Sequence, residues 1–257
     1  MRHPGGEGAP SVADRVFAVL ESCAGSSHAL SLVDLVERTG LPKTTLHRMC
    51  WKLVELGMLE HDDDGFRVGT KLFALGSMNP GLRRLRATAM PYLHGLVART
   101  GWATNLAVLA DGRALIVEEL YSGESETMRR MVGGRLPLHA TAVGKALLCG
   151  YSDEALDELL GTGVLRPYTR TTVVRPNLLR AQLEATRRTG VAFSDEEWSL
   201  GTSGVAAPVV VAGAVVAAIA AVGSPGGPAL RQRASAVRWA AAGVSRALSP
   251  SPVAIAA

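Results

Sequence analysis

The sequence has few of the residues that build disulfide frameworks or metal centres. Its three cysteines, Cys23, Cys50 and Cys149, lie far apart in the chain. An odd number of cysteines without a paired spacing supports neither a disulfide framework nor a zinc site. We therefore expect a protein of the reducing cytoplasm that needs no metal and no cofactor. Aromatic residues are also scarce, at 5%, while hydrophobic residues reach 47% of the 257 residues. Valine, leucine and alanine must therefore fill the core, which is large enough for one or two domains.

Signals for export or for membrane insertion are missing as well. Residues 1–10 contain glycine and proline but no apolar run, so they do not form a signal peptide. Residues 205–222 are 18 uncharged residues, close to the roughly 20 apolar residues that span a bilayer. Pro208 and Ala212–Gly213 interrupt this run, and its valine-rich halves are typical of two buried strands joined by a short turn. We expect no membrane association, and disordered tails over residues 1–10 and 249–257.

A general excess of positive charge is absent too. The net charge is +4 for the whole chain, and the first 76 residues carry eight Lys and Arg against ten Asp and Glu, a net of −2. Any polyanion partner would therefore have to be bound by local basic groups. Such a local group exists between Lys43 and Lys52, where three basic residues occur without any carboxylate.

That basic group belongs to a predicted helix within residues 40–57, GLPKTTLHRMCWKLVELG. Apolar residues at steps of three and four predict one buried stripe, and Pro42 suits the first helical turn. The stripe consists of Leu46, Met49, Leu53 and Leu56. The other faces hold hydrogen-bond donors and bases, as a surface that meets phosphates and base edges requires. An ordinary amphipathic helix is the alternative interpretation.

The flanking residues predict a winged helix-turn-helix over residues 11–76. Capping boxes at Ser11 with Asp14 and at Ser31 with Asp34 begin two helices, and the second ends at Thr39–Gly40. The first helix would bury Val12, Val16, Val19 and Leu20. Residues 58–61 and 66–68 are expected as two strands around the turn DDDG.

The remaining residues predict an α+β domain. Residues 79–99 hold basic residues and no carboxylate, and they are expected to form a connecting helix broken near Met90–Pro91, with 77–90 as the linker. Strands at 102–110 and 113–121 flank Asp111–Gly112, and 127–132 is a candidate edge strand. Helices are expected at 141–148, 153–160, 178–189 and 228–248, and paired strands at 205–222. This order predicts an antiparallel sheet with helices on its faces in a domain over residues 91–248.

Residues 136–148, LPLHATAVGKALL, form a second distinctive segment. A proline-bounded loop that enters a helix exposes backbone N–H groups at Thr141, Ala142 and Val143, which can hold a carboxylate.

Both segments resemble the isocitrate lyase regulator (IclR) family of bacterial transcription factors, and the resemblance covers almost the whole chain. The family's DNA-binding unit is resembled by GLPKTTLHRM together with GFRVGTKLFALG. The signature of its sensing domain is resembled by LPLHATAVGKALL, and the segment that lines its sensing pocket is resembled by DEEWSLGTSGVAAPV. The resemblance implies a winged helix-turn-helix joined by a helix to a GAF-like α/β effector-binding domain. It also implies homodimers formed through the DNA-binding halves, often paired into tetramers, which bind double-stranded promoter DNA under the control of a small organic effector, commonly an acid.

The resemblance also assigns residues of this chain to two candidate sites. The recognition-helix positions are matched by Lys43, Thr44, Thr45, His47 and Arg48, with Arg48 as the strongest candidate contact. Lys52 and Arg67 are further local candidates. In the pocket, Ala142 and Val143 match the backbone donors, while Glu196 and Leu200 belong to the later motif.

Four pocket positions depart from members that bind small polar acids with Cys, Ser and Asp. This chain has Ser194, Gly204, Ala220 and Val222 there. The changes predict a larger or less polar effector than a short keto acid, aromatic or lipid-derived, with an adaptable lining. That lining would comprise Met128, Met131, Val132 and Leu136. The alternative is that the methionines only fill the core, or that the regulator has no effector.

Three fragments could instead indicate an enzyme, and each is incomplete. VGKAL resembles the end of a phosphate-binding loop. However, His139 stands where that loop has its first glycine, and Ala146 stands where it has Ser or Thr. GTSGV has Val205 where a nucleophile elbow has glycine, and no His follows Ser203. His139 with residues 195–197 could form an acid/base pair, but a hydrogen-bonded structural histidine is the simpler interpretation. We therefore expect no enzyme. A purely architectural DNA binder would not need the second domain.

Overall fold

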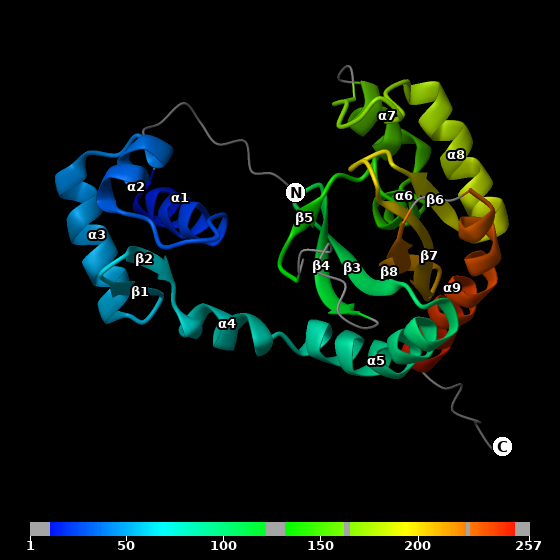
Figure 1. Cartoon of the computed structure of the whole chain (residues 1–257), viewed down its shortest axis with the longest axis horizontal. Helices are drawn as coiled ribbons and strands as arrows, with labels where there is room; N and C mark the ends of the chain where they lie inside the picture. Colours follow the sequence, from blue (N-terminus) through cyan, green and yellow to red (C-terminus); the bar gives the residue numbers. More distant parts are fainter. Residues whose placement is uncertain (1–10, 122–131, 162–164, 225–226, 250–257) are drawn as a thin grey trace, which may run out of the picture. The chain divides into compact units, whose positions relative to one another are not determined.

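The computed structural model describes residues 11–121, 132–161, 165–224 and 227–249. The chain forms two compact units, residues 1–83 and 84–257. Each unit is described by itself below (Figure 1).

The N-terminal unit is a helix-turn-helix followed by a two-stranded hairpin. Its elements are α1 (Val12–Ala24), α2 (Leu32–Thr39), α3 (Lys43–Glu55), β1 (Leu59–Asp62), β2 (Gly65–Val68) and α4 (Thr70–Ser77). The predicted capping boxes at Ser11 and Ser31 are confirmed, and Gly40 ends α2 in the left-handed conformation at φ 67°. The three helices and the hairpin were predicted. Helix α4 was not, because its residues bury nothing within this unit and so have no clear amphipathic pattern.

The core of this unit is smaller than the sequence pattern predicted. Val19, Leu35 and Leu46 are fully buried, but Val12 is 70% exposed and Leu56 is 40% exposed. Both predictions fail because the two residues lie at helix ends: Val12 is the first residue of α1, and Leu56 follows the last residue of α3. Cys50 takes the core position instead, and burial raises the pKa of its thiol to about 11.

The hairpin is held to the helices through Leu30. The backbone N–H and C=O of Leu30 each bond Phe66 at 2.8 Å. A Cβ on the neighbouring Gly65 would lie 2.5 Å from the Leu30 carbonyl oxygen, and its φ of 128° is a backbone region that favours glycine. Only glycine therefore fits at this position of the turn.

Most of α5 (Pro80–Thr100) belongs to the C-terminal unit, and this helix continues through Pro91. The predicted break near Met90–Pro91 is therefore wrong. Proline removes one backbone hydrogen bond from a helix, but the packed residues on both sides of it, Ala89, Leu93 and Leu96, are fully buried and hold the helix together.

A six-stranded antiparallel sheet follows, in the order β5-β4-β3-β8-β7-β6. The strands are β3 (Ala103–Ala110), β4 (Arg113–Leu120), β5 (Arg135–Leu136), β6 (Ala192–Asp195), β7 (Ser203–Val211) and β8 (Ala214–Gly223). The predicted hairpin at Asp111–Gly112 is confirmed, with both residues at positive φ. The residues of the uncharged run 205–222 lie in β7 and β8, as predicted. Strand β6 was not predicted. Of the predicted edge strand, residues 127–131 lie outside the described residues and Val132 lies in a turn. The edge strands of the described sheet are β5 and β6.

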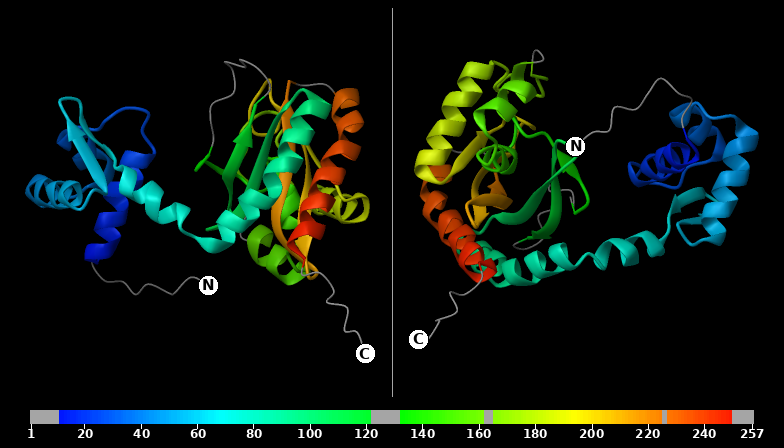
Figure 2. Two further views of the ribbon diagram at one scale, coloured as in Figure 1. Left: turned by 90° about the horizontal axis from the view of Figure 1, so that it is seen from below. Right: turned by 180° about the vertical axis from the view of Figure 1, so that it is seen from behind.

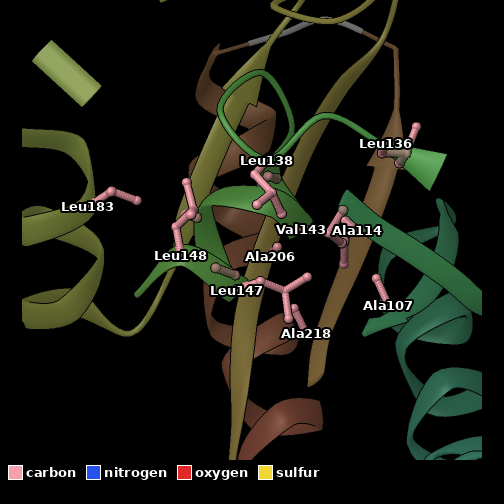
Figure 3. Packing of buried hydrophobic residues seen from close by; sticks show 14 of the residues in the cluster. Ala107, Ala114, Leu136, Leu138, Val143, Leu147, Leu148, Leu183, Ala206 and Ala218 are labelled. Atoms are coloured by element: carbon pink, nitrogen blue, oxygen red, sulfur yellow. The ribbon is translucent and has the colours of Figure 1, made fainter. Parts of the chain in front are cut away.

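Helices cover both faces of this sheet (Figure 2). On one face lie α6 (Ala142–Leu148), α7 (Asp153–Gly161) and α8 (Pro176–Thr189), with Ala206 and Ala218 of the sheet in the same apolar cluster as Val143 and Leu147 (Figure 3). The other face is covered by α9 (Gly227–Leu248), which packs on β7 and β8. The Tyr92 ring of α5 lies 5.7 Å from the Trp239 ring of α9. Within the described residues, no helix is long and apolar enough to cross a membrane.

Candidate ligand cavity and nucleic-acid interface

A cavity of about 200 Å³ lies in the C-terminal unit, between the α6 side of the sheet and the segment that follows β6. All six strands of the sheet and the start of α6 contribute to its walls, and Trp198 supplies an aromatic surface. The lining residues are Asn105, Glu119, Leu136, Thr141, Ala142, Val143, Ser194, Trp198, Ser199, Thr202, Ser203, Gly204, Ala220 and Val222. Most of this wall is apolar.

Most of the described residues that the sequence pointed to lie in this wall. They are Leu136, Ala142, Val143, Ser194, Gly204, Ala220 and Val222. Glu196 and Leu200 are not part of it. Glu196 accepts a hydrogen bond from the Gly201 backbone at 2.7 Å, and Leu200 is 60% exposed, so both shape the turn rather than the cavity. Met128 and Met131 lie outside the described residues, and Val132 is exposed in a turn.

The start of α6 is fixed against the preceding loop. Thr141 Oγ1 accepts a hydrogen bond from Gly144 N at 3.1 Å and donates one to the Pro137 carbonyl at 2.8 Å. A Cβ on Gly144 would lie 2.3 Å from the Leu138 carbonyl oxygen, so the loop and the helix touch through backbone atoms. The first N–H groups of a helix have no partner within it. Those of Ala142 and Val143 are therefore held at the cavity wall.

Two polar lining residues, Asn105 and Glu119, lie outside both segments that the sequence singled out for this site. Asn105 of β3 is 6% exposed, and its Oδ1 has no hydrogen-bond partner within the part of the chain that the structure describes. It lies in register with Glu119 on β4 and with Ala220 on β8. The available signal was a single amide within the otherwise apolar segment 103–110, but only strand pairing shows that it lies beside Glu119.

Behind the segment that follows β6 lies a buried ion pair. Lys145 Nζ is 2.6 Å from Glu197 Oε1 and donates a hydrogen bond to the Phe193 carbonyl at 3.1 Å. Burial lowers the pKa of Lys145, and the charge of Glu197 opposes that shift. The Glu197 backbone carbonyl accepts a hydrogen bond from Thr172 at 2.6 Å. This pair therefore anchors the turn that carries Trp198, Ser199 and Thr202 to the cavity.

The acid/base pair considered for His139 does not form. Its Nε2 lies 2.9 Å from the Arg166 carbonyl oxygen, and burial lowers the pKa of the ring. The three carboxylates of residues 195–197 bind other groups: Asp195 bonds Ser203, Glu196 bonds Gly201 and Glu197 bonds Lys145. The structure therefore shows His139 hydrogen-bonded to the backbone, in the arrangement expected of a structural histidine.

Helix α3 presents the predicted nucleic-acid surface. Lys43, Thr44, His47, Arg48 and Lys52 are exposed, and Thr45 is half-buried. Lys52 pairs with Glu55 at 2.9 Å, and Arg67 of β2 pairs with Asp62 and, at 3.3 Å, with Glu60. Within the described ranges, Lys43 and Arg48 have no ion-pair partner. Their charges are thus the most available to a polyanion.

His47 is oriented by the neighbouring tryptophan. Trp51 Nε1 donates a hydrogen bond to His47 Nε2 at 3.1 Å, and the Trp51 ring packs 4.9 Å from His61. A neutral imidazole that accepts at Nε2 carries its proton on Nδ1. His47 therefore offers a donor at Nδ1, which suits a phosphate or a base acceptor.

The chain matches two family models, one over each unit. Residues 82–246 match the family described as bacterial transcriptional regulator IclR C-terminal, and residues 12–63 match the IclR helix-turn-helix domain. The transcriptional repressor IclR of Escherichia coli strain K12 is 34% identical over 197 residues, which cover 75% of this chain and 72% of the repressor. The glycerol operon regulatory protein of Streptomyces coelicolor is 31% identical over 198 residues, covering 76% and 77%.

A solved structure is similar over nearly the whole chain. It is an IclR homolog from Microbacterium hydrocarbonoxydans complexed with 4-hydroxybenzoate, with a TM-score of 0.83 and 32% identity. The match covers 92% of this chain and 100% of that one.

Proposed function

The chain belongs to the IclR family of bacterial transcriptional regulators, and from that premise we propose how its two sites work. It is a DNA-binding regulator with a C-terminal effector-binding domain. We propose that α3 contacts promoter DNA through Arg48, Lys43 and His47, with neighbouring contacts from Thr44, Thr45 and Lys52. Arg67 contributes less, because its charge is already balanced by Glu60 and Asp62.

The proposed effector is an organic acid with a single ring, less polar than a short keto acid. The cavity volume of about 200 Å³ carries this proposal. An engineered apolar cavity of about 150 Å³ binds benzene, so the space suits one ring with small substituents. Trp198, Leu136 and Val143 would contact the ring, and the N–H groups at the start of α6 would receive the carboxylate. The 4-hydroxybenzoate complex of the similar homolog supports this class.

Effector binding would act on DNA affinity through linkage. A ligand shifts an equilibrium between two states only by its differential affinity for them. A coupling of about 1 to 3 kcal/mol is typical, which would change promoter affinity by roughly 5- to 150-fold. Gel shifts on the gene's own upstream region, with and without the acid, measure that factor directly.

A thermal-shift series tests the effector class. We expect benzoate and hydroxybenzoates to raise the melting temperature of the full-length protein, by about 5 to 10 °C at 100 times Kd. Glyoxylate and pyruvate should leave it unchanged at the same concentration. The matched control is Ala220→Leu, which fills the cavity and should abolish the shift. A response confined to the two- and three-carbon acids would contradict the single-ring proposal.

We further propose that the protein assembles as a homodimer through its N-terminal unit, with a dimer of dimers as the larger assembly. Apolar side chains stand exposed there: Phe17 in α1, Phe73 in α4 and Met78 after it. Phe73 is 74% exposed, and α4 buries no residue within its own unit. In the proposed dimer a second copy covers these side chains, because burying exposed apolar surface favours association.

Phe73→Glu should therefore lower the mass of the assembly without unfolding the chain. Light scattering across a concentration series would show the change as a weaker dimer, because a charge then has to be buried in the interface. Leu178→Glu is the matched control: Leu178 is also an exposed apolar helical residue, but it lies in α8 of the C-terminal unit. An unchanged mass for Phe73→Glu would exclude α4 from the dimer contact.

A further inference from the structure

Asn105 is one of the polar residues of the cavity that the proposed carboxylate site does not use. Asn105 lines the wall, is 94% buried, and its Oδ1 has no hydrogen-bond partner among the described residues. A buried acceptor without a partner destabilises a protein, so such groups are rare unless a ligand or a water satisfies them. The position of Asn105 therefore indicates a hydrogen-bond donor on whatever occupies the cavity.

The sheet register places Asn105 at the end of the cavity away from α6. Gly204 of β7 lies beneath the start of α6, since a Cβ there would be 3.4 Å from Ala142 Cβ. Strand β8 separates β7 from β3. Asn105 is aligned through Ala220 with Ala206, two residues along β7 from Gly204, so Asn105 and Gly204 are roughly 12 Å apart. A benzene ring with substituents at opposite ends is comparable to this span. The floor between the two ends is apolar, formed by Ala220 and Val222.

The neighbours of Asn105 are acceptors. Glu119 lies opposite Asn105 on β4, is half-buried, and also lines the cavity. A carboxylate on the ligand would face the Asn105 amide oxygen and lie close to the Glu119 carboxylate, and neither can donate a hydrogen bond to it. A neutral donor, such as a hydroxyl, could instead bond the Asn105 Oδ1 without repulsion.

We propose that Asn105 is a specificity-determining residue that selects effectors carrying a hydroxyl at the end remote from their carboxylate. This assignment rests on the proposed function of the cavity as the effector site. It names the second polar group of the effector, whereas the cavity volume and the helix start account only for the ring and the acid.

Calorimetric titration of the full-length protein with benzoate, 3-hydroxybenzoate, 4-hydroxybenzoate and terephthalate tests the assignment. We expect 4-hydroxybenzoate to bind about tenfold more tightly than benzoate, which is the contribution of one buried hydrogen bond. Terephthalate, which places a second carboxylate near Glu119, should not bind. In Asn105→Leu the preference for 4-hydroxybenzoate over benzoate should fall to about one.

Thr104→Val is the matched control. Thr104 precedes Asn105 on β3, is fully buried, and its Oγ1 likewise has no partner among the described residues. It faces the opposite side of the sheet, in register with Ala221, and does not line the cavity. Both Thr104→Val and Asn105→Leu replace a buried polar group by an apolar one of similar volume, so both should keep or raise the melting temperature of the ligand-free protein. Only Asn105→Leu should lose the preference.

The outcomes separate this assignment from the function it rests on. If benzoate and 4-hydroxybenzoate bind the unaltered protein equally well, or if the preference survives both Asn105→Leu and Asn105→Ala, the role of Asn105 is overturned while the single-ring effector stands. If none of the aromatic acids binds, both are overturned.

Discussion

The Lys145→Met variant is expected to lose about 3 to 5 kcal/mol of unfolding free energy, the usual effect of removing one partner of a buried ion pair. Lys145 is 1% exposed, and Glu197 Oε2 already has no hydrogen-bond partner among the described residues. Removing the ammonium group would leave the Glu197 carboxylate buried and uncompensated. Urea unfolding followed by circular dichroism would measure the loss.

Two further variants show whether the loss comes from the unpaired charge. Adding Glu197→Gln to Lys145→Met removes the charge and should recover part of the stability. Lys52→Met breaks a pair of similar N to O distance, 2.9 Å, whose side chains are 61% and 69% exposed, and exposed pairs contribute about 0 to 1 kcal/mol. A loss for Lys145→Met no larger than that for Lys52→Met would mean that water reaches the Lys145 pair.

The Lys145→Met variant should also weaken effector binding. Glu197 is followed directly by Trp198 and Ser199, which line the cavity, and the ion pair fixes the turn that carries them. We expect the thermal shift with aromatic acids to fall along with stability.

The second large effect is expected on DNA binding. Arg48→Ala should weaken specific promoter binding by about 1 to 3 kcal/mol for each helix bound, and a two-fold dimer would lose the contact twice. Arg48 is exposed on α3 and has no ion-pair partner within the described ranges, so its guanidinium is available to guanine or phosphate. Gel shifts at two salt concentrations would measure both the affinity and its salt dependence.

Arg48→Lys and Arg67→Ala are the matched comparisons. Lysine keeps the charge but cannot form the paired contact of a guanidinium, so Arg48→Lys should retain non-specific affinity and lose specificity if Arg48 contacts a base. Arg67→Ala removes a guanidinium whose charge is already balanced on β1, and its effect should be smaller. Unchanged specific binding in Arg48→Ala would place the recognition surface elsewhere.

Local features of the fold could be predicted because they depend on neighbouring residues. The capping boxes at Ser11 and Ser31 need only a carboxylate three residues later, and the Asp111–Gly112 hairpin needs only a turn that accepts positive φ. Predictions failed where packing overrode a local pattern. Pro91 lies inside a continuous helix because α5 is held by its buried residues on both sides, and Leu56 is exposed because α3 ends before it.

The sequence by itself determined the two-unit architecture, the exposed basic face of α3 and most of the apolar cavity wall. The architecture and the face of α3 follow from periodicity and capping, whereas the cavity wall was predicted from the resemblance to the IclR family. Only the tertiary structure decided which polar groups face one another. Asn105 and Glu119 are brought together by the register of β3 and β4, and Lys145 and Glu197 by the packing of α6 under the turn after β6. No local pattern encodes such pairs, because strand register and helix packing are set by burial of the whole apolar face.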